Sequence, residues 1–243
     1  MKTVVEWSVA FDLLWNNIMS GKAPGLEAYE KSLFLTQAEN ALIKDYLFSN
    51  SNAWKEGFDD SPRRQSDFRT LIVTKQLEQV EEFDHSEGFS IERNTLKFKC
   101  PSDILSIVNE EFCCKHCGIP KVMTVLPVSA EEYSRLMLAP YKFPSKGVIW
   151  RLISTNGDDG LSSYPIIELI GKLHEHTHVD YRIRYVRRPK PIILEDLLGD
   201  LSIEGETEAM TCELPEHLHD EILQRAVQIA KIAWIDDKGQ QPQ

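Results

Sequence analysis

The densest group of chemically capable side chains is the run Cys113-Cys114-Lys115-His116-Cys117, which holds three thiols and an imidazole in five residues. Thiolates and imidazoles are the usual ligands of structural zinc, and Cys114-x-x-Cys117 has the spacing of half a zinc knuckle. A structural zinc site needs four ligands, and no second Cys-x-x-Cys or His-x-x-x-His follows at finger spacing. We therefore expect a loop between two strands here. A small zinc-binding regulatory module built on the Cys113–Cys117 cluster remains the alternative function.

A second group of possible metal ligands is His174, His176 and His178. Alternate residues of a strand share one face, so the three imidazoles could bind a metal ion or form a pH-sensitive patch. The sequence offers no partner that would orient the rings. We expect the polar end of a strand, and we predict no metal and no cofactor for the chain.

Catalytic motifs are missing from the sequence. It has no Walker pattern, no G-x-G-x-x-G after a strand and no G-x-S-x-G elbow. The paired carboxylates Asp59-Asp60 and Asp158-Asp159 lie in turn-like sequence, where such pairs are solvated or cap helices. We predict that the protein is not an enzyme.

Charge is distributed unevenly along the chain. Lys plus Arg is 27 and Asp plus Glu is 38, a net charge of −11, whereas a protein that wraps nucleic acid is normally basic. From position 195 to 237 there are 12 acids and 2 bases. Directly before this acidic segment lies a basic strand with no acid in it, whose cations are Arg182, Arg184, Arg187, Arg188 and Lys190. We predict that these five residues form a protein interface, and that their partner is an acidic protein surface and not DNA.

The basic strand alternates in character. Arg182 and Arg184 share one face, and Tyr181, Ile183 and Tyr185 share the other, which we expect to face the core. The arginine face could meet the acidic segment of a neighbouring copy. The five cysteines are an odd number in a chain with no secretory signal, which favours free thiols.

Helical patterns lie toward the two ends of the chain. Phe11, Leu14, Trp15 and Ile18 recur at helical spacing, and a second helix is expected to start near Leu26. Thr36-x-x-Glu39 and Ser129-x-x-Glu132 have capping-box spacing and predict two more helix starts. The last helix is predicted from Pro215 to about Asp236.

The middle of the chain has strand patterns. We expect strands at 71–73, 96–100, 122–128, 148–153, 166–170 and 181–186, the last three neighbouring one another in an antiparallel sheet. The predicted fold class is therefore α+β, a helical bundle of the N-terminal helices and the C-terminal helix with an inserted antiparallel β-sheet region. The expected domains are an N-terminal helical part (1–70), an inserted β-rich region (71–200) and a C-terminal helix packing on the N-terminal helices (201–243).

Three stretches carry a family resemblance. They are Phe11–Ile18 with Ala23–Leu26 and Tyr29–Thr36; Tyr181–Leu194, with its phrase Arg-Arg-Pro-Lys-Pro-Ile-Ile-Leu; and Cys212–Glu216 running into Leu218-His219 and Arg225–Val227. In this order they resemble the virion structural proteins of crAss-like bacteriophages, short-tailed phages of gut bacteria. The Cys113–Cys117 cluster and the His174–His178 run lie outside these stretches.

The resemblance implies a non-enzymatic ring protein, a head–tail connector or adaptor, in the neck between portal and tail. It implies copies of itself as partners, twelve to a ring, together with the portal and other neck or tail proteins. Double-stranded DNA would pass through the channel without sequence-specific binding, and no membrane would be involved. The protein would assemble in the cytoplasm of the host bacterium and remain in the virion.

Overall fold

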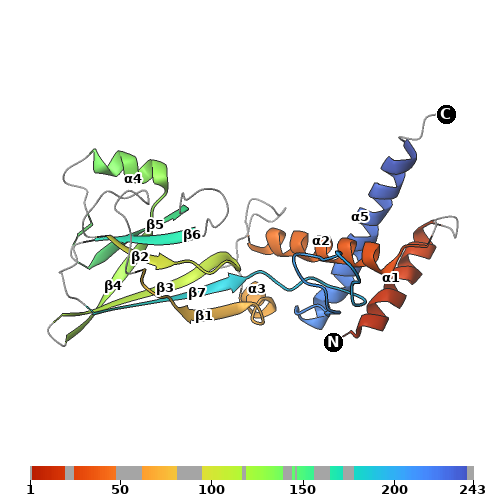
Figure 1. The fold of residues 1–243 in the computed structure, drawn as a ribbon, viewed down its shortest axis with the longest axis horizontal. Helices are drawn as coiled ribbons and strands as arrows, with labels where there is room; N and C mark the ends of the chain where they lie inside the picture. Colours follow the sequence, from red (N-terminus) through yellow and green to blue (C-terminus); the bar gives the residue numbers. More distant parts are fainter. Residues whose placement is uncertain are drawn as a thin grey trace. The chain divides into compact units, whose positions relative to one another are not determined.

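The computed structural model describes residues 2–19, 25–47, 62–80, 95–116, 119–138, 144–145, 147–155, 165–171 and 178–239. Its elements in chain order are α1 (Val4–Met19), α2 (Ala28–Leu47), α3 (Pro62–Asp67), β1 (Ile72–Gln76), β2 (Thr95–Lys99), β3 (Ile104–His116), β4 (Ile119–Pro127), α4 (Ala130–Met137), β5 (Val148–Thr155), β6 (Pro165–Ile170), β7 (His178–Arg187), the 3₁₀ turn η3 (Glu216–Leu218) and α5 (His219–Gly239) (Figure 1). The chain divides into two compact units, 1–71 with 188–243 (unit 1) and 72–187 (unit 2). Among the described residues, no helix has the length and apolar character needed to cross a membrane.

The predicted fold class is wrong, because the fold is organised around a seven-stranded mixed sheet and not around a helical bundle. The strand order is β1-β7-β3-β4-β5-β6-β2. All neighbours are antiparallel except β4 and β5, which are parallel. Parallel neighbours need a long crossover connection, and here it is the segment between Pro127 and Val148, which contains α4. The strand β7 also pairs with β1 and β3, not with β6 as expected.

The sheet curls into a half-barrel because one segment bridges its two edges. After β1, the Leu77 amide donates to the carbonyl of Tyr181 on β7 at 2.9 Å. Two residues later, Gln79 pairs with Phe98 of β2 at the opposite edge. Inside the half-barrel, Phe98 of the edge strand β2 packs against Tyr181 of β7, the neighbour of the other edge strand β1, with ring centroids 5.0 Å apart. The core inside the half-barrel also includes Phe112, Met123, Ile149, Ile167, Leu169 and Ile183.

The outer face of the sheet is covered on β5 and β6 by α4. Tyr133 of α4 packs on Trp150, Leu152 and Ile170. The predicted cap of this helix is confirmed, because Ser129 is the N-cap and its hydroxyl accepts the Glu132 amide at 3.2 Å. This cap satisfies an amide that the first helical turn leaves without a partner.

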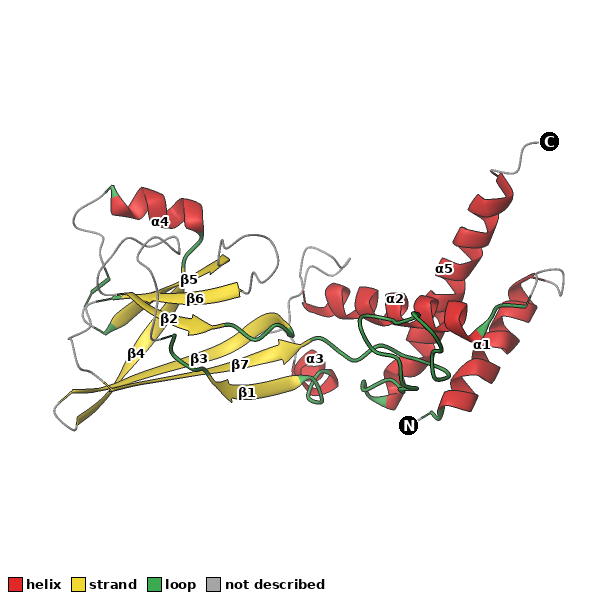
Figure 2. Cartoon of the chain, in the orientation of Figure 1, coloured by secondary structure: helices red, strands yellow, loops and turns green. Residues whose placement is uncertain are grey.

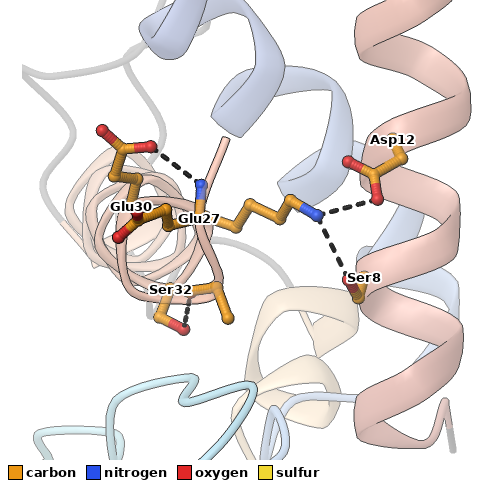
Figure 3. A network of polar contacts seen from close by, with 7 residues as sticks. Ser8, Asp12, Glu27, Glu30 and Ser32 are labelled. Atoms are coloured by element: carbon orange, nitrogen blue, oxygen red, sulfur yellow. Dashed lines mark hydrogen bonds and ion pairs between the residues drawn. The ribbon is translucent and has the colours of Figure 1, made fainter. Parts of the chain in front are cut away.

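Unit 1 joins α1, α2 and α5 through apolar and polar contacts. Trp7, Phe11 and Trp15 form the fully or almost fully buried face of α1. The ammonium of Lys31 on α2 binds the carboxylate of Asp12 on α1 at 2.7 Å (Figure 3). Because Lys31 is buried, this ion pair fixes how the two helices meet as well as neutralising the lysine.

A polar ladder on α2 holds an extended segment of the chain that follows β7. The Thr36 hydroxyl accepts the amide of Ile192 at 3.1 Å, and the Ser32 hydroxyl accepts the amide of Leu194 at 3.0 Å. The predicted helix start at Thr36 is therefore wrong, because α2 is continuous from Ala28 to Leu47. The hydroxyl that would have capped a helix serves the backbone of a distant segment, which is buried beside it.

Candidate protein-interaction site

The cysteine cluster does not gather its thiols at one point. Cys113 and Cys114 are successive residues of β3, so their side chains point to opposite faces of the sheet. Cys114 lies in the core of the half-barrel, where its thiol donates to the carbonyl of Lys121 at 3.6 Å. Cys117 and the side chain of His116 lie outside what the structure describes. Within the described part, no three potential ligands are grouped to hold a metal ion.

The histidine group is only partly within the described residues. His174 and His176 lie outside them, and His178 is the first residue of β7. The predicted common face of the three imidazoles therefore falls outside the described residues.

The alternation predicted for the basic strand is confirmed. Tyr181, Ile183 and Tyr185 face the core of the half-barrel and are almost completely buried, whereas Arg182 and Arg184 are exposed on the outer face of β7. We call Arg182 and Arg184 the arginine stripe. They stand at i and i+2 of one strand, so their guanidinium groups lie on the same surface.

Few local charges neutralise the arginine stripe. Arg184 lies opposite Thr74 on β1 and Asn109 on β3, both of them uncharged. Arg182 lies opposite Glu111, 3.9 Å from guanidinium nitrogen to carboxylate oxygen, with both side chains more than half exposed. An exposed ion pair at this distance contributes little stability because solvent screens it.

The other three residues of the predicted interface follow the strand. Arg187 ends β7 and is half-buried, and Arg188 and Lys190 are exposed in the extended segment that follows. The backbone amide of Lys190 donates to the Glu213 carboxylate at 3.1 Å. The basic strand thus continues from unit 2 into unit 1.

Polar groups inside the half-barrel fix the face of β7 that is turned away from solvent. The Tyr181 hydroxyl donates to Glu110 at 2.7 Å, and the same carboxylate oxygen lies 3.3 Å from Arg151. Burial, together with the Glu110 carboxylate, raises the pKa of Tyr181 well above its usual range. These contacts lock the strand so that the two arginines must point outward.

The acidic segment begins as an ordered loop in unit 1. Residues 195–208, which we call the acidic loop, contain six acids and no base: Glu195, Asp196, Asp200, Glu204, Glu206 and Glu208. Backbone hydrogen bonds join the two sides of the loop at Ile193 with Met210, at Leu197 with Thr207, and at Ile203 with Glu206. The loop runs beside α2, as the long loop between β7 and α5 in Figure 2 shows. Its side chains are thus presented by a fixed backbone.

Glu39 is a buried carboxyl that the sequence pattern assigned only to a helix cap. It lies on α2, is fully buried and accepts the Cys212 thiol at 3.1 Å. Desolvation, with Glu213 and Glu204 adding to it, raises its pKa to about 8. Its second carboxyl oxygen has no hydrogen-bond partner within the described part of the chain. The only sequence signal was its position one turn beyond Thr36, on the helix face that α2 buries.

Comparison with known proteins gives consistent matches over the whole chain. The family model for phage tail ring protein 3/4 matches residues 2–241. "Ring protein 4/5" of Bacteroides phage crAss001 is 40% identical over 237 residues, which cover 96% of this chain and 94% of that protein. "Ring protein 3" of the same phage is 30% identical over 233 residues, covering 94% of each.

Proposed function

The chain belongs to the phage tail ring protein 3/4 family, and on that premise we propose that its copies form a ring in the portal–tail neck of a crAss-like phage. The proposed role is structural and non-enzymatic, a head–tail connector around the channel through which the genome passes. The observation that carries the proposal is the match of nearly the full chain to ring proteins, with no large segment left over for another activity.

The degree of identity favours one of these two ring proteins as the counterpart of this chain. The chain is 40% identical to ring protein 4/5 and 30% identical to ring protein 3 of one phage. We propose that it is the counterpart of ring protein 4/5. A separate paralogue in the same virion would then correspond to ring protein 3.

The surface of α1 supports an assembly role. Val5, Val9 and Leu13 lie at i, i+4 and i+8 of this helix and are each more than half exposed. The opposite face of α1 is the buried one, so the helix is apolar on both sides. Helices apolar all round are normally buried on both sides, and an exposed aliphatic stripe favours contact with another protein.

The charge of the chain suits a channel wall. Phosphate contacts from lysine and arginine give sequence-independent affinity for DNA, which would retain a genome that has to slide. A ring of chains with a net charge of −11 each repels phosphate groups. We propose twelve copies, with the portal and further neck or tail proteins above and below the ring, assembled in the host cytoplasm and retained in the virion.

The test is a cryo-EM reconstruction of the purified virion neck, with mass spectrometry of the same particles to detect the chain. The expected result is a ring of this chain around the channel in the neck. Absence of the chain from virions would refute the structural role. Presence in the virion outside the neck would refute the connector role.

A further inference from the structure

We propose that the ring is closed by the acidic loop of one copy docking on the arginine stripe of the next copy, with Leu198 as the apolar anchor of the contact. This inference rests on the proposed ring, and it identifies the partner of the arginine stripe as a second copy of this chain. The occupant is argued from charge complementarity between two surfaces that the chain itself carries.

The acidic loop has the construction of a docking element. Its tip turns at Glu204 and Gly205, which have φ values of 52° and 88° and are flanked by the reciprocal backbone bonds of Ile203 and Glu206 at 3.0 Å. Ile203 is buried, which fixes the tip on unit 1. The Asn40 amide on α2 donates to Glu204 at 2.8 Å and holds the tip a second time. A loop already ordered loses little conformational entropy on binding.

Leu198 is the most unusual side chain in the loop. It is 83% exposed, although the backbone beside it is fixed by the bond from the Leu197 amide to the Thr207 carbonyl at 2.8 Å. Leu201, three residues on, is also exposed. Ordered, exposed leucines among carboxylates match the arrangement of an interface, where an apolar anchor is surrounded by a polar rim.

The arginine stripe is the matching surface. It belongs to unit 2, and the acidic loop belongs to unit 1. The loop has six acids and no base, and the basic strand has five bases and no acid from position 182 to 190. Opposite charges on two surfaces steer encounter and fix register. The exposed Glu111 beside Arg182 forms only a screened pair that an incoming carboxylate can replace.

A ring requires this kind of contact. A cyclic assembly with more than two copies joins two different surfaces of the same chain, head to tail. The loop and the stripe are two such surfaces, and neither is complementary to itself because each carries one sign of charge. Two loops repel each other, as do two stripes, so the contact always joins a loop to a stripe. Rings rather than closed dimers in the images show that this contact runs head to tail.

The test exchanges the charges between two variants. The stripe variant carries Arg182→Glu and Arg184→Glu. The loop variant carries Glu195→Lys, Asp200→Lys, Glu206→Lys and Glu208→Lys, which leaves two acids and four bases in the loop and makes it positive. The side chains of these four residues take no part in the loop hydrogen bonds described above. In a pure sample of either variant, like charges oppose at every contact. In an equimolar mixture, each negative stripe meets a positive loop, and each positive stripe meets a negative loop.

We expect wild type and the equimolar mixture to form rings in mass photometry and negative-stain images. Each variant alone should need a protein concentration about tenfold higher, or more, for the same assembly. A control with Lys121→Glu and Arg135→Glu makes the same charge change as the stripe variant, at exposed positions of unit 2, and should assemble like wild type. Leu198→Ser should weaken assembly several-fold, whereas Val122→Ser, at an exposed position on β4, should not. Circular dichroism of each sample checks that it is folded.

Three results would overturn the contact. They are assembly of either variant alone at the wild-type concentration, failure of the mixture where wild type assembles, and loss of assembly in the control. If wild type stays monomeric in isolation, the same samples are scored by complementation of a phage that lacks the gene. Wild type, the co-expressed pair and the control should then yield particles with a complete neck, whereas the stripe variant or the loop variant alone should not. Failure of wild type in both settings would refute the proposed ring itself.

Discussion

Replacing the buried Glu39 by glutamine should remove the contribution of this carboxyl to the pH dependence of stability in unit 1. The carboxyl is fully buried, and its pKa rises from the ordinary 4.5 to about 8 mainly through desolvation. A folded-state pKa above the unfolded value means that the native protein holds a proton that the unfolded chain releases. Stability from this group is therefore complete below about pH 4.5 and is lost as pH rises through the window from 4.5 to 8.

The size of the effect follows from the same two pKa values. A difference between 4.5 and about 8 corresponds, at ~1.4 kcal/mol per unit, to a total on the order of 5 kcal/mol. Between pH 5 and pH 7 the share lost is about 2–3 kcal/mol. Glutamine has nearly the same shape, its carbonyl can still accept the Cys212 thiol, and it does not ionise. Between pH 5 and pH 7, the free energy of unfolding of Glu39→Gln should therefore fall by about 2–3 kcal/mol less than that of wild type.

The assay is urea denaturation of wild type and Glu39→Gln at pH 5, 6, 7 and 8, followed by tryptophan fluorescence. Trp7 and Trp15 are buried in unit 1 and report its unfolding. Every other titrating group is common to both proteins, so the difference between their free energies of unfolding isolates Glu39. Glu208→Gln, at an exposed position of the acidic loop, is the matched control and should follow wild type. Parallel curves for wild type and Glu39→Gln would refute the reasoning, since they would mean that Glu39 is ionised in the native state.

Three further predictions concern a hydrogen bond within unit 1, a hydrogen bond within unit 2, and the buried thiols. Thr36→Val removes the hydroxyl that bonds the Ile192 amide and should lower the free energy of unfolding by about 1–3 kcal/mol in urea denaturation, with exposed Thr207→Val unchanged. Tyr181→Phe keeps the ring but removes the bond to the buried Glu110 carboxylate, and should cost a similar ~1–3 kcal/mol in unit 2; an unchanged thermal midpoint would contradict it. Bulky maleimides should not label the buried thiols of Cys100, Cys114 and Cys212 in the native protein within minutes. The reactive species is the thiolate, and burial raises the pKa of Cys100 and Cys212. Mass spectrometry of the peptides measures the labelling of each thiol.

Local patterns in the sequence predicted local structure well. Alternation along 181–185 assigned the arginines and tyrosines to opposite faces, and the Ser129 cap was identified from four residues. Both depend only on neighbours in the chain, where the period of a strand or the chemistry of a helix start decides the outcome. The same capping pattern failed at Thr36, because burial against Ile192 gave its hydroxyl a partner 156 residues away.

Long-range pairing was the part that sequence patterns could not supply. The order β4, α4, β5 was visible as strand, helix, strand, but nothing local decides whether β5 returns parallel to β4 or pairs elsewhere. The segment from Leu77 to Val80 has no pattern of its own, yet it bridges both edges of the sheet. Arg151 and Glu110 were missed for the same reason, since each is an ordinary charged residue of a strand until the sheet brings them to 3.3 Å.

Parts of the three stretches that carry the family resemblance are hydrogen-bonded to one another within unit 1, to which the second stretch belongs from Arg188 onward. Ser32 and Thr36 bond the segment that contains Ile192 and Leu194, and the Lys190 amide bonds Glu213. The second stretch is thus bonded to both of the others, and a change in its backbone would leave the buried amides of Ile192 and Leu194 without their partners. The resemblance therefore coincides with this set of contacts, which we call the joint, and not with a reactive site. The acidic loop lies between two of these stretches, and most of its acidic side chains are exposed. If the stripe-and-loop contact is correct, related rings in one virion can share this joint and still assemble each with its own kind, because the charges that select the neighbour lie outside it.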